Sequence, residues 1–139
     1  MVESAFVDTT FWYDFFNEGA GDHGRVKSEY AQFPGPLVTT SYVVAETVSL
    51  LCKRRGRHLA GRFLQHLQRS KRCTVFHPNE EMFDRAVVTF HQRENQLKLD
   101  LVDIISFVWM GAAGVRTALT KDGHFTMEGF TVLPPVTGS

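Results

Sequence analysis

The chain has 139 residues and a net charge of zero at neutral pH, since 15 Lys and Arg balance 15 Asp and Glu. Its hydrophobic fraction of 43% and charged fraction of 22% are typical of one globular domain and exclude a disordered chain. No apolar run approaches the roughly 18–20 residues of a membrane span, and the N-terminus lacks a secretory signal. These features predict a soluble, cytoplasmic protein, with one domain over residues 1–134 and a flexible tail over 135–139.

Short apolar runs alternate with longer helical patterns along the chain. Strands are predicted at residues 5–7, 37–39, 73–76, 118–120 and 130–133. Helices are predicted at about residues 9–16, 22–33, 42–55, 58–70, 79–92 and 102–113. Thr9 or Thr10 is the candidate cap of the first helix, and Thr40 or Ser41 that of the third. This alternation predicts an α/β fold, a three-layer sandwich whose central sheet is mainly parallel.

Four carboxylates stand out by their placement. Asp8 and Asp122 come just after predicted strands, whereas Glu46 and Asp103 interrupt apolar stretches near the starts of helices. The carboxyl ends of parallel strands meet at one edge of a sheet, where ligands commonly bind. Asp8 and Asp122 therefore face each other if their strands are neighbours. Each acid taken alone is also explained as a helix cap or a turn or surface residue.

The surroundings of Glu46 and Asp103 call for a compensating charge. An ionised carboxylate is costly to bury without one, and no Lys or Arg follows closely after either acid. Hard oxygen ligands suit Mg²⁺ or Mn²⁺. The joint pattern of the four acids therefore favours a divalent cation over four separate caps.

Four short motifs, in this order, resemble the PIN-domain nuclease family, and within it the VapC-type ribonuclease toxins of type II toxin–antitoxin systems. They are residues 6–10 (FVDTT), 39–47 (TTSYVVAET), 101–108 (LVDIISFV) and 118–125 (ALTKDGHF), the last followed by Gly129 and Phe130. The resemblance implies that Asp8, Glu46, Asp103 and Asp122 are the catalytic acids and hold Mg²⁺ or Mn²⁺. It also implies hydrolysis of RNA that leaves a 5′-phosphate and a 3′-hydroxyl.

Residues beside these motifs have supporting roles in this picture. Thr9 and Thr120 resemble polar positions of the family, where a hydroxyl orients a carboxylate or a water, although capping or strand propensity explains them equally well. Asp100, one helical turn before Asp103, is expected to raise the negative potential rather than to bind the metal. His124 is expected to be a turn residue.

Positive charge is concentrated in residues 53–72, which contain no acid. The basic side chains there are Lys53, Arg54, Arg55, Arg57, Arg62, Arg69, Lys71 and Arg72. An acidic pocket repels RNA, so nearby positive charge must hold the RNA backbone. The cluster Lys53, Arg54, Arg55 and Arg57 is the predicted RNA contact, whereas Arg62 and Arg69 taken singly suit a solvated helix face.

Five of the six residues at 11–16 are aromatic. Either most of them are core, with Trp12 or Tyr13 partly exposed, or some form an apolar groove for a partner. In the toxin family such surfaces receive an antitoxin peptide or a second copy of the toxin. The resemblance therefore implies a cognate antitoxin and a homodimer.

Two other functions remain open. A catalytically silent PIN-like module would bind RNA or protein without cutting, although the intact set of acids speaks against it. A flavodoxin-like phosphotransfer regulator also clusters carboxylates around Mg²⁺, with Lys121 as its candidate lysine. The position of Glu46 on a helix fits that class poorly.

Overall fold

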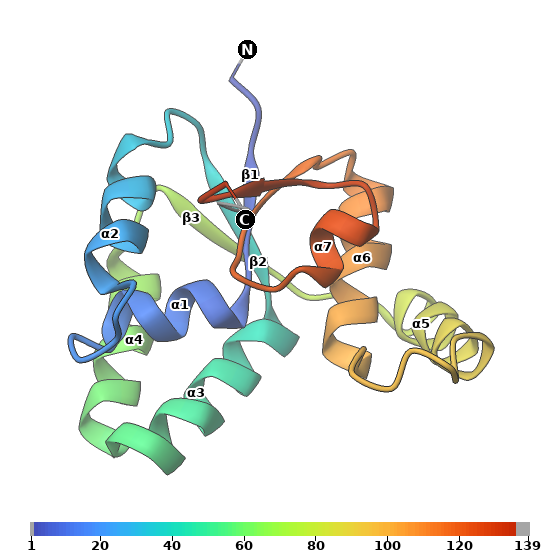
Figure 1. Cartoon of the computed structure of the whole chain (residues 1–139), viewed down its shortest axis with the longest axis horizontal. Coiled ribbons are helices and arrows are strands. Elements are labelled where there is room, and N and C mark those ends of the chain that lie inside the picture. The colour runs from blue at the N-terminus through green and yellow to red at the C-terminus, as the bar shows by residue number, and fades with distance from the viewer. Residues whose placement is uncertain (1, 136–139) are drawn as a thin grey trace.

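In the computed structural model, which describes residues 2–135, five strands form one sheet with helices around it (Figure 1). The strands are β1 (Ala5–Val7), β2 (Leu37–Thr40), β3 (Cys73–Phe76), β4 (Thr117–Leu119) and β5 (Thr131–Leu133). The helices are α1 (Thr9–Phe16), α2 (His23–Gln32), α3 (Ser41–Arg55), α4 (Arg57–Arg69), α5 (Glu80–Gln92), α6 (Leu101–Ala113) and α7 (His124–Met127).

The strand order is β3-β2-β1-β4-β5, and every neighbouring pair is parallel. From β1 the chain moves outward through β2 to β3 and then crosses back to β4. Because parallel crossovers are right-handed, this reversal puts α1 to α4 on one face of the sheet and α5 and α6 on the other, as Figure 1 shows. The predicted three-layer α/β sandwich is confirmed, and the order of strands reverses between β1 and β4.

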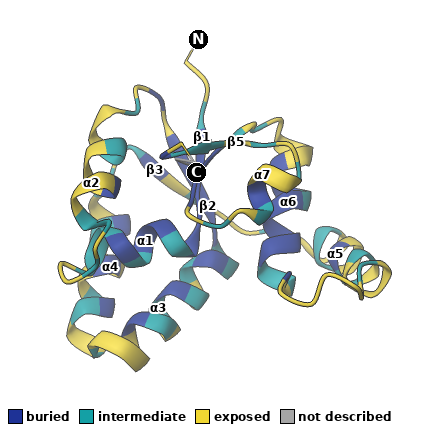
Figure 2. Cartoon of the chain, viewed as in Figure 1, coloured by how far each residue is buried: buried dark blue, intermediate teal, exposed yellow. Residues whose placement is uncertain are grey.

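The core lies on both faces of the sheet around β1, its central strand. Ala5, Phe6 and Val7 of β1 are completely buried, as a strand covered by helices on both sides requires. Figure 2 shows buried residues concentrated on the sheet and on the helix faces turned toward it. The apolar helix α6 supplies Ile104 and Met110 to this core, in agreement with its predicted burial.

Most predicted elements lie within two residues of the observed ones, and the differences are local. The short helix α7 was not predicted, because four residues show no helical periodicity. The N-cap position of α1 is Asp8, so the prediction that Thr9 or Thr10 caps this helix is wrong. Thr40 does cap α3, since its hydroxyl accepts a hydrogen bond from the Val43 backbone N at 3.3 Å.

The aromatic run on α1 is mostly core. Phe11 and Trp12 are fully buried, and the Trp12 ring packs against Phe63 of α4 with 5.4 Å between ring centroids. Either Trp12 or Tyr13 was expected to be partly exposed, and it is Tyr13 that is half-buried. Burial of these rings fixes α1 between the sheet and α4.

Among the helices of residues 2–135, none has the length and apolarity that a membrane crossing requires. Residues 136–139 of the predicted tail lie outside the described part of the chain, so the domain boundary at residue 134 stays a prediction.

Candidate active site

The four acids come together at one edge of the sheet. Val7 pairs with Leu119 in neighbouring parallel strands, so the chain leaves β1 and β4 at the same edge and carries Asp8 and Asp122 there. Glu46 lies on the second turn of α3, and Asp103 lies in the first turn of α6. Electrostatic repulsion links Asp122 to each of the other three acids.

Burial and mutual repulsion raise the pKa values of three of these acids. Burial, followed by the charge of Asp122, raises the pKa of Asp8 to about 6. The pKa of Asp103 is raised to about 8 by burial and by the charges of Asp100, Asp8 and Asp122. Glu46 has a raised pKa for the same two reasons. The raised pKa values mean that the surroundings of these carboxylates do not compensate their negative charge when they ionise. A bound divalent cation would supply the compensating positive charge.

Threonine hydroxyls orient two of the acids. The Thr120 hydroxyl donates a hydrogen bond to Asp8 Oδ2 at 2.9 Å and accepts one from the Asp122 backbone N at 2.9 Å. Thr9 donates to Glu46 Oε1 at 2.6 Å. Both hydrogen bonds lower the pKa of the carboxyl they reach, opposing the effect of burial. Thr9 and Thr120 thus contact carboxylates, as the resemblance implied.

The contacts of Thr10 and Lys121 at this edge were not predicted from the sequence. The Thr10 hydroxyl donates to Asp8 Oδ2 at 3.1 Å and accepts from the Lys121 backbone N at 2.9 Å. The Lys121 ammonium forms ion pairs with Asp14 and, at 2.8 Å, with Asp22. These contacts attach the segment before Asp122 to α1 and to the start of α2.

A reciprocal hydrogen-bond pair opens α6. The Asp103 backbone N donates to Asp100 Oδ1 at 2.9 Å, and the Asp100 backbone N donates to Asp103 Oδ2 at 3.3 Å. Asp100 is therefore the N-cap, and the prediction that Asp103 could cap this helix is wrong. The exposed Asp100 carboxylate raises the pKa of Asp103 and Glu46, which fits its expected contribution to the negative potential.

His124 is not a turn residue, because it begins α7 and directs its ring toward the acids. Its Nδ1 lies 2.7 Å from Asp122 Oδ1, and its backbone N donates to the same oxygen at 2.9 Å. Asp103, Asp122 and His124 present ligand atoms that all lie within 4.8 Å of one another. Carboxylate oxygens with one imidazole nitrogen are donors that suit a divalent cation.

The predicted RNA contact lies at the far end of α3. Lys53, Arg54 and Arg55 are exposed in its last turn, and Arg57 follows on α4. The helix rise of 1.5 Å per residue puts Arg55 about 13 Å along the axis from Glu46. The Arg54 guanidinium lies over the Tyr13 ring, 5.5 Å from its centroid. The four side chains of this cluster are exposed, and none of them forms an ion pair with an acid among the described residues.

Arg72 differs from the other basic residues of this segment. It is half-buried, and its guanidinium donates to the backbone carbonyls of Tyr30, Phe33 and Gly35. These bonds hold the turn between α2 and β2. This role in the fold argues against Arg72 as an RNA contact.

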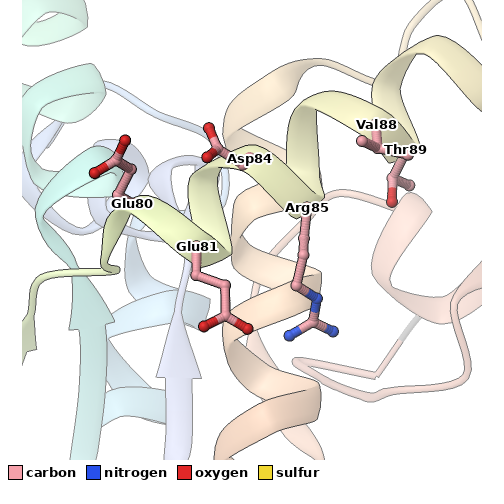
Figure 3. A pocket seen from close by; sticks show the side chains of 6 residues that line it. All are labelled: Glu80, Glu81, Asp84, Arg85, Val88 and Thr89. Atoms are coloured by element: carbon pink, nitrogen blue, oxygen red, sulfur yellow. The ribbon is translucent and has the colours of Figure 1, made fainter.

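A hollow of about 650 Å³ on the outer side of α5 is separate from the candidate active site, since none of the four acids Asp8, Glu46, Asp103 and Asp122 lines it (Figure 3). All of its lining residues belong to this one helix: Glu80, Glu81, Asp84, Arg85, Val88 and Thr89. Asp84 and Arg85 are exposed there.

Comparisons with known proteins agree with this geometry. Residues 5–127 match the family model of the PIN domain. The chain is 32% identical over 130 residues to "23S rRNA-specific endonuclease VapC20" of Mycobacterium tuberculosis, in both strain CDC 1551 / Oshkosh and strain H37Rv, covering 94% of this chain and 98% of that protein.

Two solved structures also share the fold. The crystal structure of M. tuberculosis VapC20, a sarcin–ricin loop cleaving toxin, superposes with a TM-score of 0.83 at 30% identity, covering 91% of this chain and 96% of that chain. VapBC2 from Rickettsia felis, bound to a promoter DNA fragment, has a TM-score of 0.64 at 13% identity, covering 93% and 96%, which speaks for the fold alone. The family match and the identity along nearly the whole chain show that this protein belongs to the PIN domain family.

Proposed function

We propose that this protein is a metal-dependent endoribonuclease, the toxin of a toxin–antitoxin pair, and that it hydrolyses a phosphodiester bond in RNA. The observation that carries the proposal is the convergence of Asp8, Glu46, Asp103 and Asp122 from four separate elements. Burial and repulsion raise the pKa values of the first three. Membership of the PIN domain family and identity to an rRNA endonuclease support the same activity.

The four acids are the proposed ligands of Mg²⁺ or Mn²⁺. A bound divalent cation would neutralise their charge, lower the pKa of the attacking water and shield the leaving oxygen. Thr9 and Thr120 hold two of the carboxylates in place through their hydroxyls. The products would carry a 5′-phosphate and a 3′-hydroxyl.

The substrate we propose is the sarcin–ricin loop of 23S rRNA. This target is the one named for VapC20, which matches the chain over 94% of its length. The exposed cluster Lys53, Arg54, Arg55 and Arg57 would neutralise RNA phosphates at the far end of α3, about 13 Å along the helix axis from Glu46. Phosphate contacts of this kind position an RNA without reading its sequence.

A cognate antitoxin is the proposed protein partner, and a homodimer is the proposed assembly. The match to VapC20, which is described as a toxin, supports an antitoxin partner, because a cell that makes a toxin needs an inhibitor of it. Co-expression with the product of any small open reading frame found directly upstream tests the antitoxin, since failure to form a complex and to block cleavage contradicts that partner. Light scattering of the purified toxin tests the dimer, since a monomer mass contradicts it.

Cleavage of a defined RNA tests the activity. The purified protein is incubated with a sarcin–ricin loop hairpin in Mg²⁺, in Mn²⁺ and in EDTA, and the new 5′ end is tested for a phosphate by ligation. We expect one cut in either metal and none in EDTA. Asp122→Asn should abolish the cut, whereas Asp84→Asn, which removes an exposed acid on α5, should leave it unchanged. Full cleavage in EDTA would contradict a metal-dependent nuclease.

A further inference from the structure

A basic trough runs between α4 and the pair α1–α2. It lies away from the acidic edge, which is the edge of the sheet that carries Asp8, Glu46, Asp103 and Asp122. Two adjoining hollows of about 200 and 540 Å³ form it, and they share Phe16 and Arg62 as lining residues. Lys27 and Arg55 line the smaller hollow, and Arg69 lines the larger one. We call this surface the α4 trough and define it by these five residues.

The cations of the α4 trough are available to a ligand. Lys27, Arg55, Arg62 and Arg69 are exposed, and within residues 2–135 none of them has an acid at ion-pair distance. Glu18 is the one acid that lines either hollow. The unpaired positive charge therefore favours an anionic partner.

Aromatic rings lie beside these cations. Phe16 and Tyr30 line the larger hollow, and the Lys27 ammonium lies over the Phe15 ring, 4.7 Å from its centroid. A groove that combines Lys and Arg with aromatic faces is typical of surfaces that follow a nucleic-acid strand. A purely apolar peptide would cover the same rings but leave four cations without partners. Charge complementarity thus favours an RNA over such a peptide.

The helices connect the α4 trough to the acidic edge. α1 starts next to Asp8 and ends at Phe16, about 12 Å farther along its axis. α3 also starts at that edge and ends at Arg55, and Figure 1 shows both helices leading away from the sheet. An RNA backbone that passes the acids can therefore reach the trough within a few nucleotides.

We propose that the α4 trough binds the sugar-phosphate backbone of the substrate RNA a few nucleotides from the bond that is cut, so that the protein holds a folded RNA at two places. The inference rests on the proposed ribonuclease function. It adds α4 to the predicted contact at residues 53–57 and assigns a joint role to Arg62 and Arg69.

Salt-dependent RNA binding tests the trough. A fluorescent sarcin–ricin loop hairpin is titrated with protein in EDTA at several salt concentrations, and the slope of log Kobs against log salt is compared. Each lost phosphate contact lowers the slope magnitude by about 0.7–0.9. We therefore expect Arg62→Gln/Arg69→Gln to lower it by about 1.5 and to weaken binding at least tenfold. Arg62→Lys/Arg69→Lys, which keeps the charge, should restore most of the slope.

The control removes the same charge elsewhere. Arg85→Gln/Arg116→Gln changes two exposed arginines outside the trough and should affect the slope much less. Equal slopes for the trough variant and wild type would overturn the trough, as would equal losses in the trough and control variants.

Cleavage assays of the same proteins separate the two proposals. If wild type cuts the hairpin in Mn²⁺ but the trough variant keeps the wild-type slope, only the trough is wrong. If wild type cuts no RNA in either metal, the proposed function is wrong, and the slopes still decide whether the trough contacts RNA. Folding of each variant is checked by its melting temperature, because Arg62 and Arg69 are exposed and their loss should not unfold α4.

Discussion

The Thr9 hydroxyl donates a 2.6 Å hydrogen bond to Glu46 Oε1 and thereby joins the first turn of α1 to the second turn of α3. This bond lowers the pKa of Glu46, whereas burial raises it. Neither residue is near the other in sequence, so the contact depends on the packing of the two helices that begin at the acidic edge.

Removing the Thr9 hydroxyl should weaken metal binding. Losing a group that orients a metal ligand typically costs 10–100-fold in metal affinity. We expect Thr9→Val to weaken Mn²⁺ binding at least tenfold in isothermal titration calorimetry, with an unchanged far-ultraviolet circular dichroism spectrum. Thr9→Ser keeps a hydroxyl and should retain most of the affinity. Wild-type affinity in the valine variant would argue that Glu46 does not bind the metal.

Neutralising Asp8 should abolish cleavage and yet stabilise the metal-free protein. Asp8 is 2% exposed, and burial together with Asp122 opposes its ionisation. Asparagine removes the charge but can still accept from the hydroxyls of Thr120 and Thr10. We expect Asp8→Asn to have a higher melting temperature than wild type in EDTA and no RNA cleavage in Mn²⁺.

The matched control for Asp8→Asn is a buried acid that already has a cation. Asp14 is 7% exposed and pairs with Lys121. Breaking a buried ion pair leaves the other charge uncompensated, so Asp14→Asn should lower the melting temperature in EDTA. If both asparagine variants shift the melting temperature in the same direction, repulsion within the acidic group is not what destabilises the metal-free protein.

The stability gained from Asp8→Asn should depend on pH. The folded protein holds protons on Asp8 up to about pH 6 and on Asp103 up to about pH 8, whereas an unfolded Asp releases its proton near 3.8. The stability that these protons contribute is therefore complete below about pH 4 and is lost as the pH rises through the two folded pKa values. For Asp8 the loss is about 3 kcal/mol, because one pKa unit corresponds to about 1.4 kcal/mol.

Thermal unfolding of both proteins across this range provides the measurement. In EDTA, the melting temperature of Asp8→Asn should exceed that of wild type by a margin that grows between about pH 4 and pH 6, where only the folded protein holds the Asp8 proton. Saturating Mn²⁺ at the upper end should reverse the order, since it supplies the missing positive charge to wild type. A margin that stays constant with pH would show that Asp8 titrates normally in the folded protein.

Lys121 should position Asp122 through its contacts with α1 and α2. Its ammonium pairs with Asp14 and Asp22, and its backbone N donates to Thr10. Lys121→Met removes the ion pairs but keeps the backbone bond, so we expect a lower melting temperature and weaker Mn²⁺ binding. In a double-mutant cycle, Lys121→Met and Asp14→Asn should be non-additive, because each removes the same contact. Additive losses would contradict a direct Lys121–Asp14 interaction.

The sequence was sufficient to predict the arrangement of the acids because a simple geometric rule governs it. Residues that follow parallel strands emerge at one edge, so the pattern of strands and helices put Asp8 and Asp122 at the same edge. That they face each other depended on β1 and β4 being neighbours, which the structure shows. Burial of Asp103 followed from the apolar residues on both sides of it. Both predictions rest on local information: the alternation of strands and helices along the chain, and the apolar residues next to Asp103 in the sequence.

Contacts that depend on tertiary packing could not be predicted. Thr10 and Lys121 are separated by 111 positions, and no local pattern joins them. Asp14 gave one overlooked signal, since a single acid in an aromatic run needs a partner when the run is buried. His124 was assigned to a turn because α7 is too short to show periodicity, and its bond to Asp122 depends on the direction of that helix.

Arg72 shows why charge alone does not identify an RNA contact, and a pair of variants should separate the two roles. Its guanidinium serves three backbone carbonyls of the turn before β2, whereas the nearby Arg69 is exposed and has no acid at ion-pair distance among the described residues. Hydrogen bonds to a charged group contribute about 1.5–3 kcal/mol each. A glutamine amide has only two N–H donors and cannot keep all three bonds, so Arg72→Gln should destabilise the fold by at least about 1.5 kcal/mol in urea unfolding. At low temperature, where the variant remains folded, its salt slope for RNA binding should equal that of wild type. Arg69→Gln should show the opposite pattern, with unchanged stability and a smaller slope. A reduced slope in folded Arg72→Gln would return this arginine to the RNA-binding surface.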